Sequence, residues 1–324
     1  MSTSLVLFGL LAGCSVDNPF YCELTKPCSA ELVCEPALHR CLTARLYAQR
    51  PSFPVDGIDY KGTWSSSEET IWAVGNQGDT TRLGVGMTWY SLAKTAFALE
   101  DIWGVDEKNV WAVGQAGALL RINEQGNAWV QLAGVNQDVD LLGIWGTSAA
   151  DIWAVGSQGK IIHFDGTAWS EVASNTTRVL AAVHGLSTSD VWAVGERGVI
   201  LHYDGTSWRQ SAELGANLYA VWANLPNDVW AAGQSGLLAH WDGASWRPIL
   251  GLTTSTIYSL WGNGPSVMWA VGASGLILRR SGADFSVLSS DSKGDFYAVH
   301  GYASNAVTLV GKQGTIFSYL LRAD

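Results

Sequence analysis

A four-residue phrase, Trp-Ala-Val-Gly, recurs along most of this chain at a nearly constant spacing. Its first residue stands at Trp72, Trp111, Trp153, Trp192, Trp230 (where the phrase reads Trp-Ala-Ala-Gly) and Trp269, and a degenerate copy begins at Thr308. The intervals are 39, 42, 39, 38, 39 and 39 residues. Such a period indicates repeat units that bury their apolar faces against one another. We therefore divide this part of the chain into seven equivalent units.

Two further columns of residues share the period. Eight residues before the anchors stand Trp64, Trp103, Trp145, His184, Trp222, Trp261 and His300, and most are followed by glycine. About 16 to 18 residues after the anchors stand Trp89, Trp129, Trp169, Trp208, Trp246 and Phe285. With 17 Trp, 36 Gly and only 15% charged residues, the composition is typical of an all-β protein.

Each unit reads as four short strands. In the fifth unit we expect strands over 218–222, 229–232, 237–241 and 246–250, separated by turn residues such as Asp242-Gly243. A Gly-x-x-Gly pair follows the anchor strand in all seven units, and this repetition favours a tight hairpin over a phosphate-binding loop.

Units of four strands and about 40 residues predict a seven-bladed β-propeller over residues 45–324; a solenoid is the alternative. The seventh unit ends at Asp324, before its fourth strand. The segment Gln49–Phe53 is similar to Trp246–Leu250, the fourth strand of the fifth unit. We therefore expect this N-terminal segment to supply the missing outer strand and to close the ring.

The units resemble the WAVG-type repeats of bacterial propeller lipoproteins, and more loosely the tectonin propellers. Val191–Gly195 and Leu201–Trp208, with their copies, carry the resemblance. The tectonin likeness implies a glycan-binding role, although tectonin repeats differ after the final Trp. A shared fold does not by itself fix a function.

The N-terminus carries features of an exported protein. Ser4–Leu11 is apolar but far too short to span a bilayer, which suits a signal peptide. Leu11-Ala12-Gly13-Cys14 resembles the lipobox of bacterial lipoproteins, which implies cleavage after residue 13 and acylation of Cys14, with palmitate among the acyl groups. Ser15, by the same resemblance, favours the outer membrane, with the periplasmic or surface side left open.

Two questions stay open at this end. The residues before the apolar stretch include no Lys or Arg, so either the start codon is misassigned or the n-region is unusual. The alternative to a lipoprotein signal is a buried apolar segment that ends in a free cysteine.

Four cysteines, Cys22, Cys28, Cys34 and Cys41, follow within a short segment that we assign, with Cys14, to a spacer over residues 14–44. In an exported protein an even number of cysteines indicates two disulfides. Three connectivities are possible, and we favour Cys22–Cys34 with Cys28–Cys41. A zinc site is the rival, but the C-x2-4-C pairs that it prefers are absent.

Recurring polar residues suggest chemistry at first sight. His163, His202 and His240 share one position of the third strand, where other units have Arg82, Arg121 and Arg279, so we interpret it as a polar repeat position rather than a metal site. For His184 and His300 we expect structural roles near the ring axis. Asp165, Asp204 and Asp242 precede glycine and predict turns. Asp151, Asp190 and Asp228, with Asn109, are expected to accept hydrogen bonds from backbone amides.

Residues that break the repeat mark a candidate binding face. The connections between units vary most, and in a propeller they lie on the same face as the Gly-x-x-Gly turns. The candidates are Asn175, Arg178, Glu196, Arg197, Asn217, Lys312 and Gln313.

Charge and motifs exclude several functions. A net charge of −10 with 19 Lys and Arg argues against nucleic-acid binding. Neither Gly-x-Ser-x-Gly nor His-Glu-x-x-His occurs, and we expect no catalytic residues, no cofactor and no metal. The favoured interpretation is a monomeric, lipid-anchored module that binds or scaffolds a protein partner. A surface glycan-binding module is the alternative, and an extracytoplasmic hydrolase is third.

Overall fold

The computed structural model describes residues 32–35, 40–48, 57–84, 86–132, 138–288, 290, 292–304 and 306–322. The chain divides into two compact units, one of residues 1–45 with 320–324 and the other Leu46–Tyr319. The predicted signal peptide and Cys14 lie outside the described residues.

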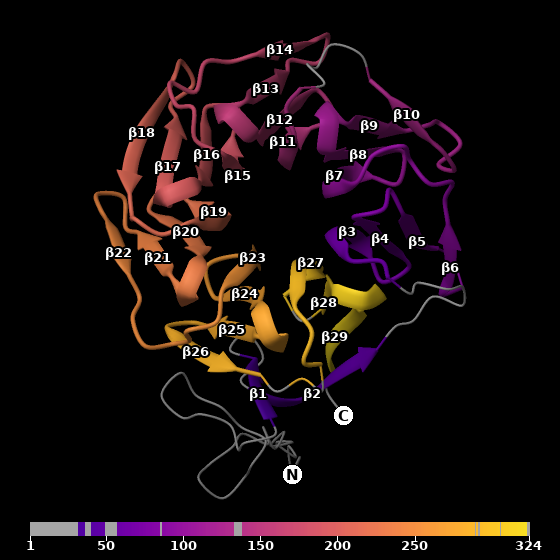
Figure 1. The fold of residues 1–324 in the computed structure, drawn as a ribbon. Helices are drawn as coiled ribbons and strands as arrows, with labels where there is room; N and C mark the ends of the chain where they lie inside the picture. Colours follow the sequence, from indigo (N-terminus) through magenta and orange to yellow (C-terminus); the bar gives the residue numbers. More distant parts are fainter. Residues whose placement is uncertain are drawn as a thin grey trace, which may run out of the picture. The chain divides into compact units, whose positions relative to one another are not determined.

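The larger unit is a ring of small antiparallel sheets, which confirms the predicted seven-bladed propeller (Figure 1). Each blade begins with an inner strand that faces the ring axis. These strands are β3 (Tyr60–Ser67), β7 (Leu99–Asp106), β11 (Leu141–Ser148), β15 (Leu180–Ser187), β19 (Leu218–Leu225), β23 (Ile257–Gly262) and β27 (Phe296–Ala303).

The second strand of each blade contains the anchor of the repeat. These strands are β4 (Thr70–Gly75), β8 (Asn109–Gly114), β12 (Asp151–Gly156), β16 (Asp190–Gly195), β20 (Asp228–Gly233), β24 (Val267–Gly272) and β28 (Ala306–Gly311). Their side chains are almost all buried, because each second strand lies inside its sheet and between two neighbouring blades.

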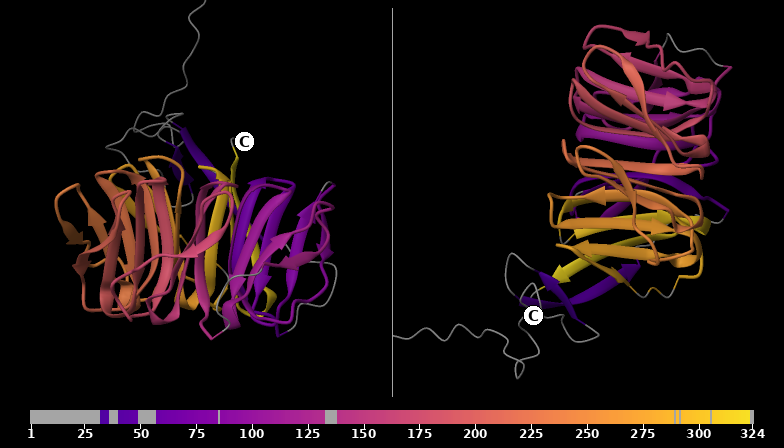
Figure 2. Two further views of the ribbon diagram at one scale, coloured as in Figure 1. Left: turned by 90° about the horizontal axis from the view of Figure 1, so that it is seen from above. Right: turned by 90° about the vertical axis from the view of Figure 1, so that its left-hand side faces the viewer.

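The third and fourth strands complete the blades toward the outside of the ring. The third strands are β5 (Thr80–Gly84), β9 (Leu119–Ile122), β13 (Ile161–Phe164), β17 (Val199–Tyr203), β21 (Leu238–Trp241), β25 (Ile277–Ser281) and β29 (Ile316–Arg322). The fourth strands are β6 (Thr88–Ser91), β10 (Trp129–Gln131), β14 (Trp169–Glu171), β18 (Trp208–Glu213), β22 (Trp246–Pro248) and β26 (Asp284–Val287). Figure 2 shows the strands running across the thickness of the ring.

In six blades the Gly-x-x-Gly pair forms one 3-10 turn between the second and third strands. The turns are η1 (Gln115–Gly117), η2 (Ser157–Gly159), η3 (Glu196–Gly198), η4 (Gln234–Gly236), η5 (Ala273–Gly275) and η6 (Lys312–Gly314). The two glycines have different roles. Gly156 is extended, and a Cβ on it would lie 1.9 Å from the carbonyl oxygen of Asp140, whereas Gly159 has a left-handed φ of 71°.

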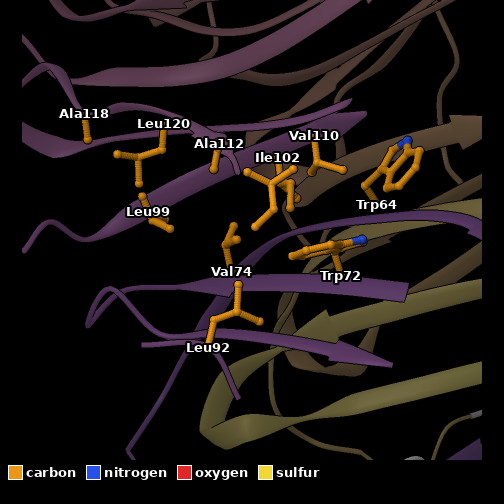
Figure 3. Packing of buried hydrophobic residues seen from close by; sticks show 11 residues of the cluster. Trp64, Trp72, Val74, Leu92, Leu99, Ile102, Val110, Ala112, Ala118 and Leu120 are labelled. Atoms are coloured by element: carbon orange, nitrogen blue, oxygen red, sulfur yellow. The ribbon is translucent and has the colours of Figure 1, made fainter. Parts of the chain in front are cut away.

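The hydrophobic core consists of layers between blades. Figure 3 shows one such layer, in which Trp72 and Val74 of the first blade pack against Leu99, Ile102 and neighbouring side chains of the second. A layer of the same kind joins the last blade to the first: Ala298, Val310 and Ile316 pack with Ile58, Tyr60 and Ala73. The first and last blades are therefore neighbours, as a ring requires.

The structure describes only part of the N-terminal segment, so it tests few of the predictions made for it. In the smaller unit β1 (Leu32–Glu35) pairs antiparallel with β2 (Arg40–Ala48), in a register that places Cys34 opposite Cys41. Cys22 and Cys28 lie outside the described residues, so the disulfide pairing stays a prediction. Gln49–Phe53 also lies outside them, and closure by that segment stays a prediction.

Candidate functional site

The seven Gly-x-x-Gly turns lie at one end of the blades, which we call the turn face. In each blade the amide after the first glycine donates to the carbonyl of the residue just before the inner strand, as Ser157 does to Asp140 (2.9 Å) and Lys312 to Asp295 (3.0 Å). The inner strands therefore begin at the turn face. The connections between blades lie there too, since Thr95 N donates to Gly78 O (2.9 Å).

Side chains on this face join several blades to the next. The left-handed residue of a turn donates its amide to the side chain that precedes the next inner strand: Ala116 to Asp140 (2.9 Å), Arg197 to Asn217 (2.8 Å), and Ser274 to Asp295 (2.9 Å). Gln313 donates in the same way to Asp59 (3.0 Å), which joins the last blade to the first. A residue that breaks the repeat at these positions therefore changes an inter-blade contact.

A row of tyrosines lies on the inner strands close to the turn face. Tyr219, Tyr258 and Tyr297 take the second position of β19, β23 and β27, and we call them the tyrosine row. The ring centroids of Tyr219 and Tyr258 are 5.8 Å apart, and those of Tyr258 and Tyr297 are 5.5 Å apart. All three rings are half-buried, so solvent reaches part of each ring.

The row continues onto the first two blades as a pair of charged residues. Nζ of Lys61 lies 3.6 Å from the ring centroid of Tyr297, a cation–π contact between the first and last blades. Glu100 takes the same position in the next blade; burial raises the pKa of its carboxyl, and the positive charge of Lys61 opposes that rise. Five consecutive blades thus present a continuous strip of aromatic and charged groups.

Carboxylates lie close to two of the three tyrosines and to Glu100. Burial, followed by the negative charges of Asp59 and Asp295, raises the pKa of Tyr297 to about 12. Burial and Asp295 likewise raise the pKa of Tyr258. Asp140 adds to the raised pKa of Glu100. The strip therefore lies in a negative field, and the phenols of Tyr258 and Tyr297 stay neutral at physiological pH.

The predicted binding-face residues fall into two groups on the turn face. Asn175, Arg178, Glu196, Arg197 and Asn217 belong to the third, fourth and fifth blades, where Arg178 forms an ion pair with Glu213 (2.9 Å). Asn175, with a φ of 60°, and Arg178 line a shallow, open depression beside η2. Lys312 and Gln313 lie in η6 on the last blade. Their binding role stays a prediction.

The sequence analysis missed the tyrosine row. The signal was present in the column after the first residue of each inner strand, which reads Lys61, Glu100, Leu142, Ala181, Tyr219, Tyr258 and Tyr297. This position varies from unit to unit, but its residues come together only when the ring places the last blade beside the first.

The histidines of the third strands serve packing. Nε2 of His163 lies 2.6 Å from Oδ1 of Asp151, and its ring stacks on Trp153 at a centroid distance of 4.0 Å. His202 and His240 repeat the arrangement with the aspartate and tryptophan of their own blades. Arg82, Arg121 and Arg279 place a guanidinium over the corresponding tryptophan instead.

One expectation about these aspartates is wrong. Asp190 and Asp228 accept hydrogen bonds from the indole Nε1 of Trp192 (2.9 Å) and Trp230 (2.7 Å), and Asp151 binds Thr147 and His163, instead of capping backbone amides. The aspartates expected in turns do cap amides. Asp165, for example, accepts from Thr167 and Ala168, and hydrogen bonds lower its pKa to about 2.

Asp101 is a half-buried carboxyl on the inner strand of the second blade. Burial raises its pKa to about 7, although Oδ2 accepts from Ile144 N and Oδ1 from Ile102 N. Because backbone amides bind both oxygens, we assign Asp101 to holding blades two and three together. Among the described residues, no group of three His, Cys, Asp or Glu side chains is arranged to hold a metal ion.

The fold and the site define a seven-bladed β-propeller with a partly accessible aromatic and charged strip on its turn face. No known protein family and no curated protein matches the sequence. Many solved structures have a similar fold, and three serve as examples. Virginiamycin B lyase from Staphylococcus aureus is 12% identical, covers 86% of this chain and 100% of its own, and has a TM-score of 0.75.

YCF48 bound to D1 peptide is 15% identical, with coverage of 86% and 95% and a TM-score of 0.69. The WD40 repeats of RRP9 are 11% identical, with coverage of 85% and 100% and a TM-score of 0.70. At these identities the likeness shows the fold alone. One similar protein is a lyase and another was solved with a peptide, so the fold does not decide between catalysis and binding. Among the described residues, no helix is long and apolar enough to cross a membrane.

Proposed function

We propose that this chain is a binding module for a protein partner, which it holds on the turn face. The observation that carries the proposal is the strip formed by Lys61, Glu100 and the tyrosine row. It is partly accessible and lies where the blades differ from one another. Tyrosine is enriched at protein interfaces because it joins a large apolar area to a polar end.

The other observations suit binding better than catalysis. Backbone amides engage Asp101, and the repeated histidines bind the aspartates of their own blades, so these groups are committed to the fold. YCF48, which has a similar fold, is known bound to a peptide. This supports the proposal as an analogy of fold.

Photo-crosslinking tests the proposal directly. A benzophenone amino acid replaces Arg197 or Gln313, which are exposed on the turn face, in the full chain expressed in its own cells. The control positions, Lys108 and Ser189, are exposed at the opposite end of the inner strands. We expect one shared partner to crosslink at both turn-face positions and at neither control. Equal adducts from both faces, or no turn-face adduct, would contradict the proposal.

A glycan-binding module is the second candidate, because sugar rings stack on partly exposed aromatic side chains such as the tyrosine row. A glycan array with the full chain tests it. Glycan binding that is lost in Tyr258→Ala would show that the tyrosine row binds a sugar. If no glycan on the array binds, this candidate is excluded.

We propose further that Cys14 is acylated and anchors the protein in the bacterial outer membrane. The support is the resemblance of Leu11–Cys14 to a lipobox and the Ser15 that follows it. Metabolic labelling with a palmitate analogue tests the anchor. The wild-type chain should take up label and Cys14→Ser should not; equal uptake by both would refute the assignment.

A further inference from the structure

The tyrosine row has a spacing that suits an extended chain. Its centroids are 5.5 and 5.8 Å apart, and alternate side chains of an extended peptide lie about 6.6–6.8 Å apart. The three rings come from consecutive blades, and each is partly accessible. Successive side chains on one side of an extended segment can therefore meet successive rings.

The charge around the row is negative. Four carboxylates, Asp59, Glu100, Asp140 and Asp295, lie on the first, second, third and last blades next to the row or to each other. Lys61 contacts the row, and Lys312 in the neighbouring turn adds a second positive charge. The whole chain carries −10, so a cationic partner is attracted from a distance as well.

The chain itself already places a cation on one of these rings. Nζ of Lys61 sits 3.6 Å from the centroid of Tyr297, which leaves Tyr219 and Tyr258 without a cation on their faces among the contacts of the described residues. A Lys or Arg side chain from outside would repeat the contact that Lys61 makes. Such a contact is strongest where the surroundings exclude part of the water.

We propose that the tyrosine row binds the Lys or Arg side chains of an extended segment of the partner protein. This inference rests on the proposed function and names the chemistry of the partner. The rings of Tyr219 and Tyr258 supply the faces, and Asp295 and Asp59 supply the field. Lys61 marks one end of the row, since its own ammonium occupies the face of Tyr297.

The test uses the full chain and three fluorescent peptides of about twelve residues. They are identical except that alternate positions are Lys and Arg, Gln, or Glu. Fluorescence anisotropy measures the affinity of each. We expect the cationic peptide to bind at least about tenfold more tightly than the Gln peptide, and the Glu peptide to bind more weakly than either. Added salt should lower the affinity of the cationic peptide most.

Substitutions locate the binding. Tyr258→Ala should lower the affinity for the cationic peptide about tenfold. Tyr258→Phe keeps the ring, so its affinity should stay within about twofold of the wild-type value. Tyr90→Ala removes a tyrosine that is 51% exposed on β6 and should change nothing. Should Tyr258→Ala fail to fold, Asp295→Asn serves instead. It keeps the acceptor for Ser274 N but loses the charge, and it should weaken the cationic peptide several-fold.

The outcomes separate the two proposals. Equal affinity for the Gln and cationic peptides, or no loss in a folded Tyr258→Ala or Asp295→Asn, would overturn the cationic assignment. If no peptide binds but the turn-face crosslinks are still formed, the cationic assignment is also overturned. The proposed function stands in that case. If crosslinks are absent too, both fail. Glycan binding that is lost in Tyr258→Ala would mean that the tyrosine row binds sugars, and it would overturn the inference.

Discussion

At the scale of single residues, the size of each inner-strand aromatic side chain matches the residue that it faces on the next blade: Trp faces Gly, and the smaller His faces a residue with a Cβ. Trp222 rests on Gly262 of the next blade, where an added Cβ would lie 2.3 Å from the indole, and Trp145 rests on Gly185 in the same way. His184 instead faces Ala223, whose amide donates to its Nδ1 (3.2 Å). The smaller imidazole therefore stands where the facing residue has a Cβ, and His300 opposite Ser65 repeats the arrangement.

This rule predicts a strong coupling between His184 and Ala223. His184→Trp should destabilise the fold by about 1–3 kcal/mol through overpacking, and adding Ala223→Gly should recover part of the loss. Urea unfolding of the two single variants and the double variant measures the coupling. The reciprocal pair, Trp222→His with Gly262→Ala, is the control and should also lose less than the sum of its single changes. Strict additivity in both cycles would contradict the rule.

Asp101 predicts a pH dependence of stability. Its pKa rises from 3.8 to about 7 on folding, so between these values the folded state holds a proton that the unfolded state has lost. Its contribution therefore falls as pH rises from about 4 to 7 and is constant above that. In Asp101→Asn this fall is absent, so the stability of the variant minus that of wild type should rise by a few kcal/mol across the window.

Denaturant titrations at several pH values measure this difference. His184 and His300, whose pKa values burial lowers to about 4 and about 3, are present in both proteins, so their effects cancel. A difference that does not change between pH 4 and 7 would show that Asp101 is ionised throughout that range.

At the scale of elements, the turns and strands were largely predictable from the sequence. The fifth blade has its strands at Leu218–Leu225, Asp228–Gly233, Leu238–Trp241 and Trp246–Pro248, close to the expected ranges. The repeat made this possible, because a comparison of the seven units distinguishes the positions that the turn requires from the positions that vary. The partners of Asp190 and Asp228 were not predictable, because backbone capping and indole or imidazole hydrogen bonds are equally compatible with the sequence.

The first glycine of each turn should be essential for a steric reason. Gly156→Ala places a Cβ against the carbonyl of Asp140 and should cost at least about 3 kcal/mol of unfolding free energy. Gly294→Ala, whose Cβ would meet its nearest neighbours at 3.7 Å, is the matched control and should change stability by about 0.5 kcal/mol or less. Similar losses in the two variants would refute the steric argument.

The side chains before the inner strands should hold the turn of the preceding blade. Asn217→Ala removes the acceptor of the Arg197 amide and should cost about 1 kcal/mol, whereas Asn217→Asp keeps the acceptor. Hydrogen exchange should become faster at the Arg197 amide in the alanine variant alone. An unchanged rate there would mean that water or another group satisfies this amide.

At the scale of the whole molecule, the candidate site extends across the junction of the last and first blades. Lys61 contacts Tyr297, Ser65 N donates to His300 Nδ1 (3.1 Å), and Gln313 donates to Asp59. The sequence predicted the ring and the end at which its turns and connections lie, but not the tyrosine row. Residues 61 and 297 lie at opposite ends of the repeat array, and only the closed ring brings their side chains together.

The central claim is that a partner binds at the tyrosine row of this ring. Fluorine NMR of the full chain labelled with 3-fluorotyrosine tests it, because the ten tyrosines report separately and single Tyr→Phe substitutions assign them. On adding the cationic peptide, the signals of Tyr219, Tyr258 and Tyr297 should shift, while that of Tyr90 stays in place. Saturating peptide that shifts Tyr90 but leaves all three signals of the row unchanged would contradict the account.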